Sequence, residues 1–163
     1  MSTARCIGRG FGLPRNRQKN EPWNLGGNCY RHVREAMFLR ERLRPYVMKQ
    51  MALASAKGIP PMRPVFFDFE QGDPKTAEIE DQFLFGPDLL VAPITRFEQR
   101  SRQVYLPAGT DWTDAWTGKK FEGGQTIEAD APIERIPVYL RGDQPELLKL
   151  FAAKAPKDPM QQD

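Results

Sequence analysis

QFLFGPDLLVAPI, residues 82–94, contains two short apolar runs separated by Gly86 and Pro87. Apolar runs of about four to eight residues between turn residues are typical of β-strands. The chain has 15 prolines and 13 glycines among 163 residues, so turn residues recur along most of it. Such frequent turns argue against a bundle of long helices and favour many short strands.

Similar short runs lie on both sides of this stretch, with turn residues every 8–12 residues or so. The predicted strands are 62–69, 82–85, 89–94, 103–106, 111–116, 120–122, 125–129 and 137–140. This spacing predicts a mainly β fold, an antiparallel sandwich or barrel-like unit.

The first third of the chain has a different pattern. Residues 1–27 have neither a helical nor a strand period, because glycine and proline interrupt them. A helix is predicted over 28–57, since apolar residues recur on one side of it. Pro45 lies inside this helix and is expected to kink or split it. A last helix is predicted over 146–154, followed by a polar tail.

Charge is distributed unevenly along the chain. Residues 1–63 contain 13 Lys or Arg and 3 Asp or Glu, a net charge of +10, whereas residues 64–163 contain 11 and 18, a net charge of −7. A basic arm in which Trp23 stacks on a base is one hypothesis, and it implies nucleic-acid binding. The pattern favours the alternative, a solvated basic face that pairs with carboxylates elsewhere.

Two cysteines, one histidine and a glycine-rich segment carry little chemistry. Cys6 and Cys29 lack the neighbours of a zinc site and are predicted to be reduced thiols of a cytoplasmic protein. No apolar segment is long enough for a secretory signal or a membrane span. Nothing places a nucleophile near His32, and residues 8–12 lack the Lys-Ser/Thr end of a phosphate-binding loop.

Clustered acidic residues are the first candidates for acid–base chemistry. Glu78, Glu80 and Asp81 form one cluster, and Asp111 and Asp114 flank a tryptophan. A glycosidase needs two carboxyl groups that face each other across the scissile bond. Both clusters lie beside turn residues, so we interpret them as solvated loop acids.

Four aromatic residues suggest an alternative function. Tyr105, Trp112, Trp116 and Phe121 would form a sugar-stacking platform if their rings were exposed on one face. That arrangement would make the chain a stand-alone carbohydrate-binding module. Cross-strand packing within the sheet is the interpretation that the pattern favours.

Several strings occur in an order that resembles the family 31 glycoside hydrolases, and together they cover about residues 9–142. The most specific is 81–93, DQFLFGPDLLVAP. The others are EPW at 21–23, LRPY at 43–46, MRPVFFDF at 62–69, VYLPAG at 104–109, WTD at 112–114, WTG at 116–118, GG at 123–124, AP at 131–132 and IPVYLR at 136–141.

The resemblance implies a function that this chain does not carry by itself. The family hydrolyses α-linked terminal sugars with retention, using one carboxylate as nucleophile and another as acid/base. Both carboxylates belong to barrel strands upstream of the region that this chain resembles. We therefore expect a C-terminal fragment that supports the catalytic barrel. No catalytic, substrate-binding or metal-binding residue is assigned, and no cofactor.

Two positions depart from the family pattern. Where the family usually has a sugar-binding histidine, this chain has Phe11, whose ring cannot donate a hydrogen bond to a hydroxyl. After Arg141 the family usually continues with small residues and an apolar strand, whereas this chain has a charged, helix-like tail. Asp81 and Gln82 are expected to anchor the bend before a strand rather than to act on substrate.

The resemblance also divides the chain. Residues 1–58 would be the end of a (β/α)8 barrel, comprising the irregular basic segment and the kinked helix. Residues 59–142 would be a β-sandwich, and 143–163 a helical or disordered tail. The expected partners are the missing barrel and, through it, an α-linked oligosaccharide; membrane and nucleic acid are not favoured. Self-association is expected through the helix face of Val33, Met37 and Leu43, if the barrel leaves it uncovered.

Overall fold

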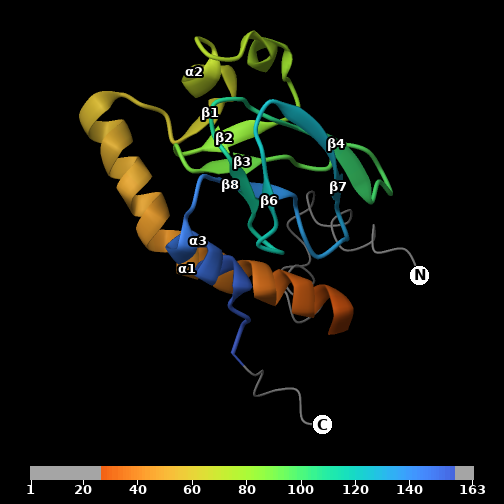
Figure 1. Cartoon of the computed structure of the whole chain (residues 1–163). Coiled ribbons are helices and arrows are strands. Elements are labelled where there is room, and N and C mark those ends of the chain that lie inside the picture. Colours follow the sequence, from red (N-terminus) through yellow and green to blue (C-terminus); the bar gives the residue numbers. More distant parts are fainter. Residues whose placement is uncertain (1–26, 157–163) are drawn as a thin grey trace, which may run out of the picture. The chain divides into compact units, whose positions relative to one another are not determined.

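A computed structural model describes residues 27–156 of the chain (Figure 1). The chain divides into two compact units. The larger, Leu43–Ala152, is called the sandwich unit. The smaller, called the helix unit, is described over 27–42 and 153–156. None of the helices between residues 27 and 156 is long and apolar enough to span a membrane.

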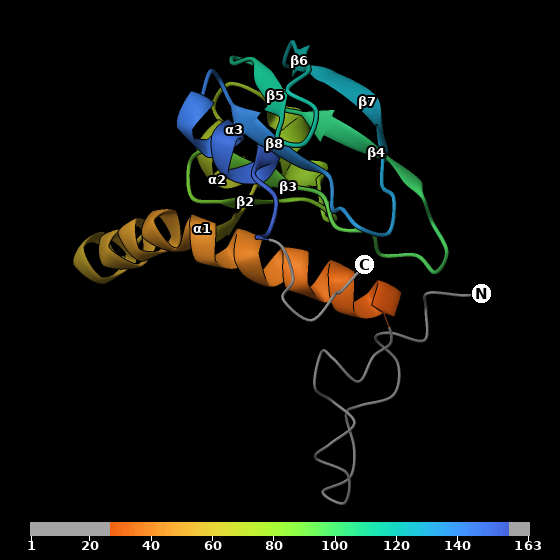
Figure 2. The same cartoon turned by 90° about the horizontal axis from the view of Figure 1, so that it is seen from below.

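The sandwich unit contains two antiparallel sheets. The first has six strands in the order β1-β2-β3-β8-β5-β6, and the second pairs β4 with β7. Figure 2 shows the β4–β7 ribbon at one side of the unit and α3 at the other. The strands are β1 (Met62–Pro64), β2 (Phe83–Phe85), β3 (Leu89–Val91), β4 (Ser101–Leu106), β5 (Trp112–Asp114), β6 (Lys120–Phe121), β7 (Gln125–Asp130) and β8 (Val138–Arg141).

The core lies between the two sheets. Leu84 and Leu90 face it from the first sheet, and Val104 and Leu106 from β4, all four with no exposed surface. Along β4, buried and more exposed residues alternate, as the two-residue period of a strand requires. The prediction of a mainly β fold with an antiparallel sandwich is confirmed.

The described residues also form helices. Helix α1 runs over Gly27–Lys57 without a break, with Pro45 inside it. The predicted bounds of this helix are therefore confirmed, and the proline does not split it in two. Helix α3 (Pro145–Ala152) buries Leu147 and Phe151. The 3₁₀ helix η4 (Pro74–Glu78) was not predicted from the sequence.

The predicted strand 62–69 is wrong beyond residue 64. The strand β1 ends at Pro64, and Phe66–Phe69 form a helical turn, α2. The burial explains the change: Val65 and Phe69 are buried, four residues apart, while Phe66 and Phe67 between them are exposed. In a strand Phe67 would share the buried face of Val65 and Phe69, so its exposure fits a helical turn instead.

The expectations for the N-terminal residues have two outcomes. Cys29 is disulfide-bonded, so the prediction that it is a reduced thiol is wrong. The expectations for Cys6, residues 8–12 and Trp23 lie outside the described residues.

The C-terminal half of α1 docks on the β2–β3 turn within the sandwich unit. The Tyr46 hydroxyl donates a hydrogen bond to the carbonyl oxygen of Phe85 (3.0 Å), and Gln50 is buried. Burial, followed by the negative charge of Asp88, raises the pKa of Tyr46. Gly86 has φ +64°, and a Cβ there would lie 2.2 Å from the Tyr46 hydroxyl oxygen. Only glycine allows this close approach of the helix.

Candidate functional site

The four aromatic candidates do not form a platform. Trp112 has no exposed surface, and its Nε1 donates to the carbonyl of Pro107 (2.9 Å). A ring in this position cannot stack on a sugar. Phe121 packs edge-on against Tyr139, with ring centroids 6.0 Å apart. The packing interpretation therefore holds for these two residues.

Trp116 is half-buried, and its polar and aromatic groups already have partners. Its Nε1 donates to the carbonyl of Ile136 (2.7 Å). The ring contacts Phe151 of α3 edge-on, with centroids 5.2 Å apart and planes at 89°, and the Arg135 guanidinium lies 5.8 Å from its centroid. Trp116 therefore packs within the fold, as the favoured interpretation of the four rings expected, although its ring partner is a helix rather than a neighbouring strand.

Tyr105 belongs to a different group, centred on the buried carboxylate of Asp73. The Tyr105 hydroxyl donates to Asp73 Oδ2 (2.6 Å), and the Ala108 amide donates to the same oxygen (2.9 Å). Burial raises the pKa of Asp73, but the hydrogen bonds from Tyr105, Ala108 and Lys75 outweigh it, so the pKa is lowered. Burial, then the hydrogen bond and charge of Asp73, raise the pKa of Tyr105 to about 12.

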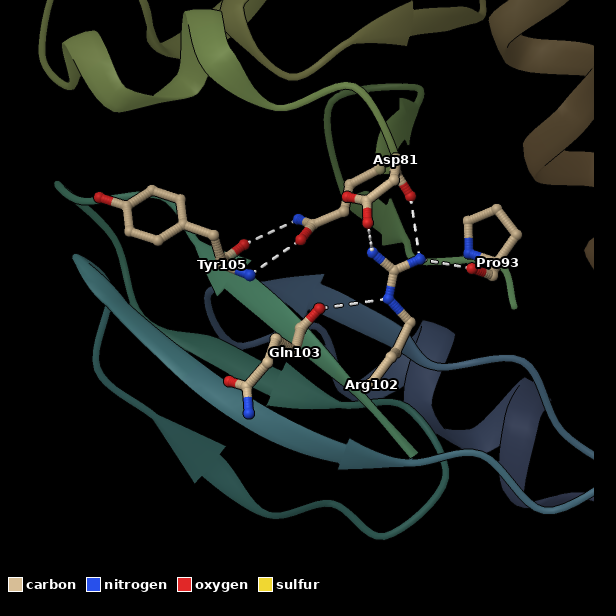
Figure 3. A network of polar contacts seen from close by, with 6 residues as sticks. Asp81, Pro93, Arg102, Gln103 and Tyr105 are labelled. Carbon is tan, nitrogen blue, oxygen red and sulfur yellow. Dashed lines mark hydrogen bonds and ion pairs between the residues drawn. The ribbon is translucent and has the colours of Figure 1, made fainter. Parts of the chain in front are cut away.

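A second polar network connects the segment before β2 with β4 (Figure 3). Arg102 is buried and forms an ion pair with Asp81, whose carboxylate is 58% exposed. Its guanidinium also donates to the carbonyls of Asp81 (3.0 Å), Gln103 (3.2 Å) and Pro93. Asp81 precedes β2 and Pro93 follows β3, so these bonds fix the segments at both ends of the β2–β3 hairpin against β4.

Gln82 completes this network by acting as a strand partner. Its Nε2 donates to the Tyr105 carbonyl (2.9 Å), and its Oε1 accepts from the Tyr105 amide (2.8 Å). The side-chain amide thereby takes the place of a backbone peptide beside β4. Asp81 and Gln82 anchor the bend before a strand, in agreement with the sequence analysis.

A groove of about 410 Å³ opens beside this network. It is lined by Glu78, Ile79, Glu80, Asp81, Gln82, Gln103, Tyr105 and Thr126. The three carboxyl groups all come from one short segment, and the lining residues of β4 and β7 have none. The groove therefore does not place two carboxyl groups on opposite walls, as glycoside hydrolysis requires.

A second groove, of about 460 Å³, is lined by two acidic side chains and one lysine. Its lining residues are Gly109, Thr110, Asp111, Thr113, Lys120, Gly142 and Asp143. The Lys120 ammonium lies 3.6 Å from Asp143, and both of these side chains are mostly exposed. Asp111 is exposed as well. Glycoside hydrolysis needs two carboxyl groups that face each other across the scissile bond, whereas here one of the two acids pairs with a lysine on an exposed surface.

The last two candidates from the sequence are Asp114 and His32, and neither lies in a catalytic arrangement. Asp114 Oδ1 accepts from the amides of Trp116 (2.8 Å) and Thr117 (3.3 Å), a turn-closing role. His32 lies half-buried on α1, in the helix unit. Within the described part of the chain, no group of three or more His, Cys, Asp or Glu side chains could hold a metal ion.

Sequence reasoning missed the importance of Asp73. Gly72, Asp73 and Pro74 read as a turn, and that signal does not distinguish a solvated turn acid from a buried one. The partners of Asp73 lie 32 and 35 residues further along the chain. Only the tertiary fold brings them together.

Comparison with solved structures finds similar domains within larger enzymes. A GH31 α-xylosidase from a soil metagenome, solved with xylose, is 46% identical, with a TM-score of 0.76 over 80% of this chain and 19% of that one. The GH31 α-xylosidase of Xanthomonas citri is 47% identical, with a TM-score of 0.69 over 74% of this chain and 13% of that one.

Comparison of sequences agrees. The α-glucosidase 2 of Bacillus thermoamyloliquefaciens is 35% identical over 124 residues, which are 76% of this chain and 16% of that protein. The chain thus spans less than a quarter of the length of these relatives. The model of the glycosyl hydrolase family 31 C-terminal domain matches residues 58–144. This chain therefore belongs to glycosyl hydrolase family 31, through the C-terminal domain of that family.

Proposed function

We propose that this chain is the C-terminal part of a retaining α-glycosidase, that its domain supports a catalytic barrel, and that the chain by itself does not hydrolyse glycosides. The observation that carries the proposal is the position of the family match, residues 58–144, on a sandwich in which the two grooves described above lack a facing pair of buried carboxyl groups. The relatives named above, an α-glucosidase and two α-xylosidases, indicate an α-linked sugar as the substrate of the parent enzyme.

The structural role rests on rigidity and on exposed apolar surface. Buried networks around Asp73 and Arg102 hold the loops of the sandwich unit in place. Met48, Met51, Met62 and Phe67 are each at least half exposed in the same unit. Met48 and Met51 are three residues apart on α1, so their side chains are neighbours on one helix face. Adjacent exposed apolar side chains mark a surface that another polypeptide covers, and the proposed cover is the barrel.

The test of inactivity is direct. The purified chain is incubated with p-nitrophenyl α-glucoside and p-nitrophenyl α-xyloside, and nitrophenol release is followed by absorbance. We expect a rate equal to that of buffer. A rate typical of an enzyme, about 1 s⁻¹ or more, that falls when Asp111 and Asp143 are replaced by Asn would contradict the proposal. The same rate in a parallel purification from cells that lack the chain would indicate a contaminating glycosidase.

A further inference from the structure

The segment after α3 lies outside the residues that the family model matches, 58–144. Helix α3 is fixed to the sandwich unit by its buried residues Leu147 and Phe151. The chain then leaves this unit, and residues 153–156 belong to the helix unit together with the N-terminal half of α1. The two ends of the described chain therefore meet in one compact unit.

Two hydrogen bonds join these ends. The amide of Ala155 donates to Glu35 Oε2 (3.0 Å), across 120 residues of sequence. Arg34 Nη2 donates to the carbonyl oxygen of Pro156, across 122 residues. The Arg34 guanidinium also lies 5.0 Å from the centroid of the Phe38 ring, which restricts its position. Adjacent charged residues of α1 thus hold a backbone donor and a backbone acceptor of the tail.

We propose that residues 153–156 are a strap that fastens the N-terminal half of α1. Helices in proteins owe most of their stability in water to tertiary contacts rather than to intrinsic propensity, and the two bonds to the tail are such contacts. Both bonds pair a charged side chain with a backbone group, and such bonds are stronger than those between neutral groups. The strap gives this half of α1 a fixed partner within the chain itself.

The strap has a consequence for the partner. If the proposed function holds, a barrel that binds α1 at Arg34 and Glu35 has to displace residues 155 and 156 from these two side chains. The strap itself is independent of the glycosidase assignment. Its test uses no substrate, so failure of the strap and failure of the proposed function are separate results.

The experiment compares two truncated chains by hydrogen–deuterium exchange, without reductant so that the disulfide of Cys29 is kept. One chain ends after Ala152 and lacks the strap; the matched control ends after Pro156 and keeps it. We expect exchange in residues 31–42 to be about fivefold faster in the shorter chain, as the loss of one or two hydrogen bonds predicts. Exchange in β2, β3 and β8 should be equal, which shows that both chains are folded. Equal exchange in 31–42 would overturn the strap.

Point variants of the full chain test the anchor. Glu35→Ala removes the acceptor of the Ala155 amide and should accelerate exchange in residues 31–42. Glu35→Gln keeps an acceptor oxygen, so exchange in these residues should stay near the rate of the unchanged chain. Arg40→Ala, at an exposed position of the same helix, is the control for a lost charge. Equal exchange in Glu35→Ala and Arg40→Ala would also overturn the proposal.

Discussion

The carboxylate of Asp73 shows how one residue holds several loops together. It is 5% exposed, yet it accepts hydrogen bonds from Tyr105 on β4 and from Ala108 in the turn after β4. Removing this carboxylate would leave its buried donors without an acceptor. The free-energy cost of an unsatisfied buried donor exceeds the net contribution of the hydrogen bond itself. Asp73 thus connects the η4 segment to the second sheet.

At this scale we predict that Asp73→Asn lowers the free energy of unfolding at pH 7 by about 1–3 kcal/mol. The pKa of Asp73 is lower in the folded chain than the ordinary value near 3.8. Its charge therefore stabilises the fold above that pH, and this contribution disappears as the pH falls through the lowered folded pKa. The difference between the two proteins should shrink below about pH 4.

The measurement is urea unfolding of both proteins, followed by tryptophan fluorescence between pH 7 and pH 3. Asp143→Asn is the control, because that carboxylate is 78% exposed. A difference for Asp73→Asn that stays constant down to pH 3 would show that its charge is not the stabilising feature.

At the scale of elements, the fit of α1 on the β2–β3 turn depends on Gly86. We predict that Gly86→Ala lowers the free energy of unfolding of the sandwich unit by about 3 kcal/mol or more. Part of this comes from the strain of a side chain at positive φ, about 1–3 kcal/mol. The rest comes from the clash of the new Cβ with Tyr46 and Gln50.

Gly58 is the matched control for this prediction. Its φ is +67°, close to that of Gly86, but nothing lies within 4 Å of a Cβ built there. Gly58→Ala should therefore show the strain without the clash. Denaturant midpoints of the two variants give the difference, and equal losses would mean that α1 does not approach Gly86 as closely as the structure indicates.

Helix α3 contacts the sandwich unit through the ring of Phe151, which packs against Trp116. The sequence predicted a helix at 146–154, and its observed bounds are Pro145–Ala152. The amphipathic pattern predicts that one face is buried, but not what it contacts. The contact of Phe151 with Trp116 is set by the fold, and it gives the Trp116 ring a structural partner that the sequence did not predict.

At the scale of the whole molecule, exposed apolar surface predicts self-association of the isolated chain. Of the expected face, Met37 is exposed, while Val33 and Leu43 are half-buried. Met48 and Met51 add exposed apolar surface further along α1. Replacing both Met48 and Met51 by Glu should shift the chain toward the monomer in sedimentation velocity at increasing concentration.

The control replaces Ala52 and Ala56 by Glu, which adds the same charge at exposed positions of α1 without removing a large apolar side chain. We expect this control to associate as the unchanged chain does. Equal shifts in the two variants would show that added charge, rather than lost apolar surface, causes the effect. An unchanged chain that stays monomeric at every concentration would contradict the prediction.

The sequence by itself determined the order of the strands along the chain and the family. Both depend on local signals, namely apolar runs, turn residues and short motifs. Each of these signals extends over a few residues and does not depend on which distant residues it contacts. The same locality explains the error at 62–69, where Val65 and Phe69 satisfy an apolar strand pattern and a helical turn alike.

Only the tertiary structure decided which polar and aromatic groups are buried. Trp112 and Trp116 are the same residue type four positions apart, yet one is enclosed in the core and the other is half-buried against a helix that begins at Pro145. Asp73 and Asp143 are both loop acids in the sequence, and only the first meets buried donors. Burial depends on residues that are distant in sequence, so a local pattern does not contain it.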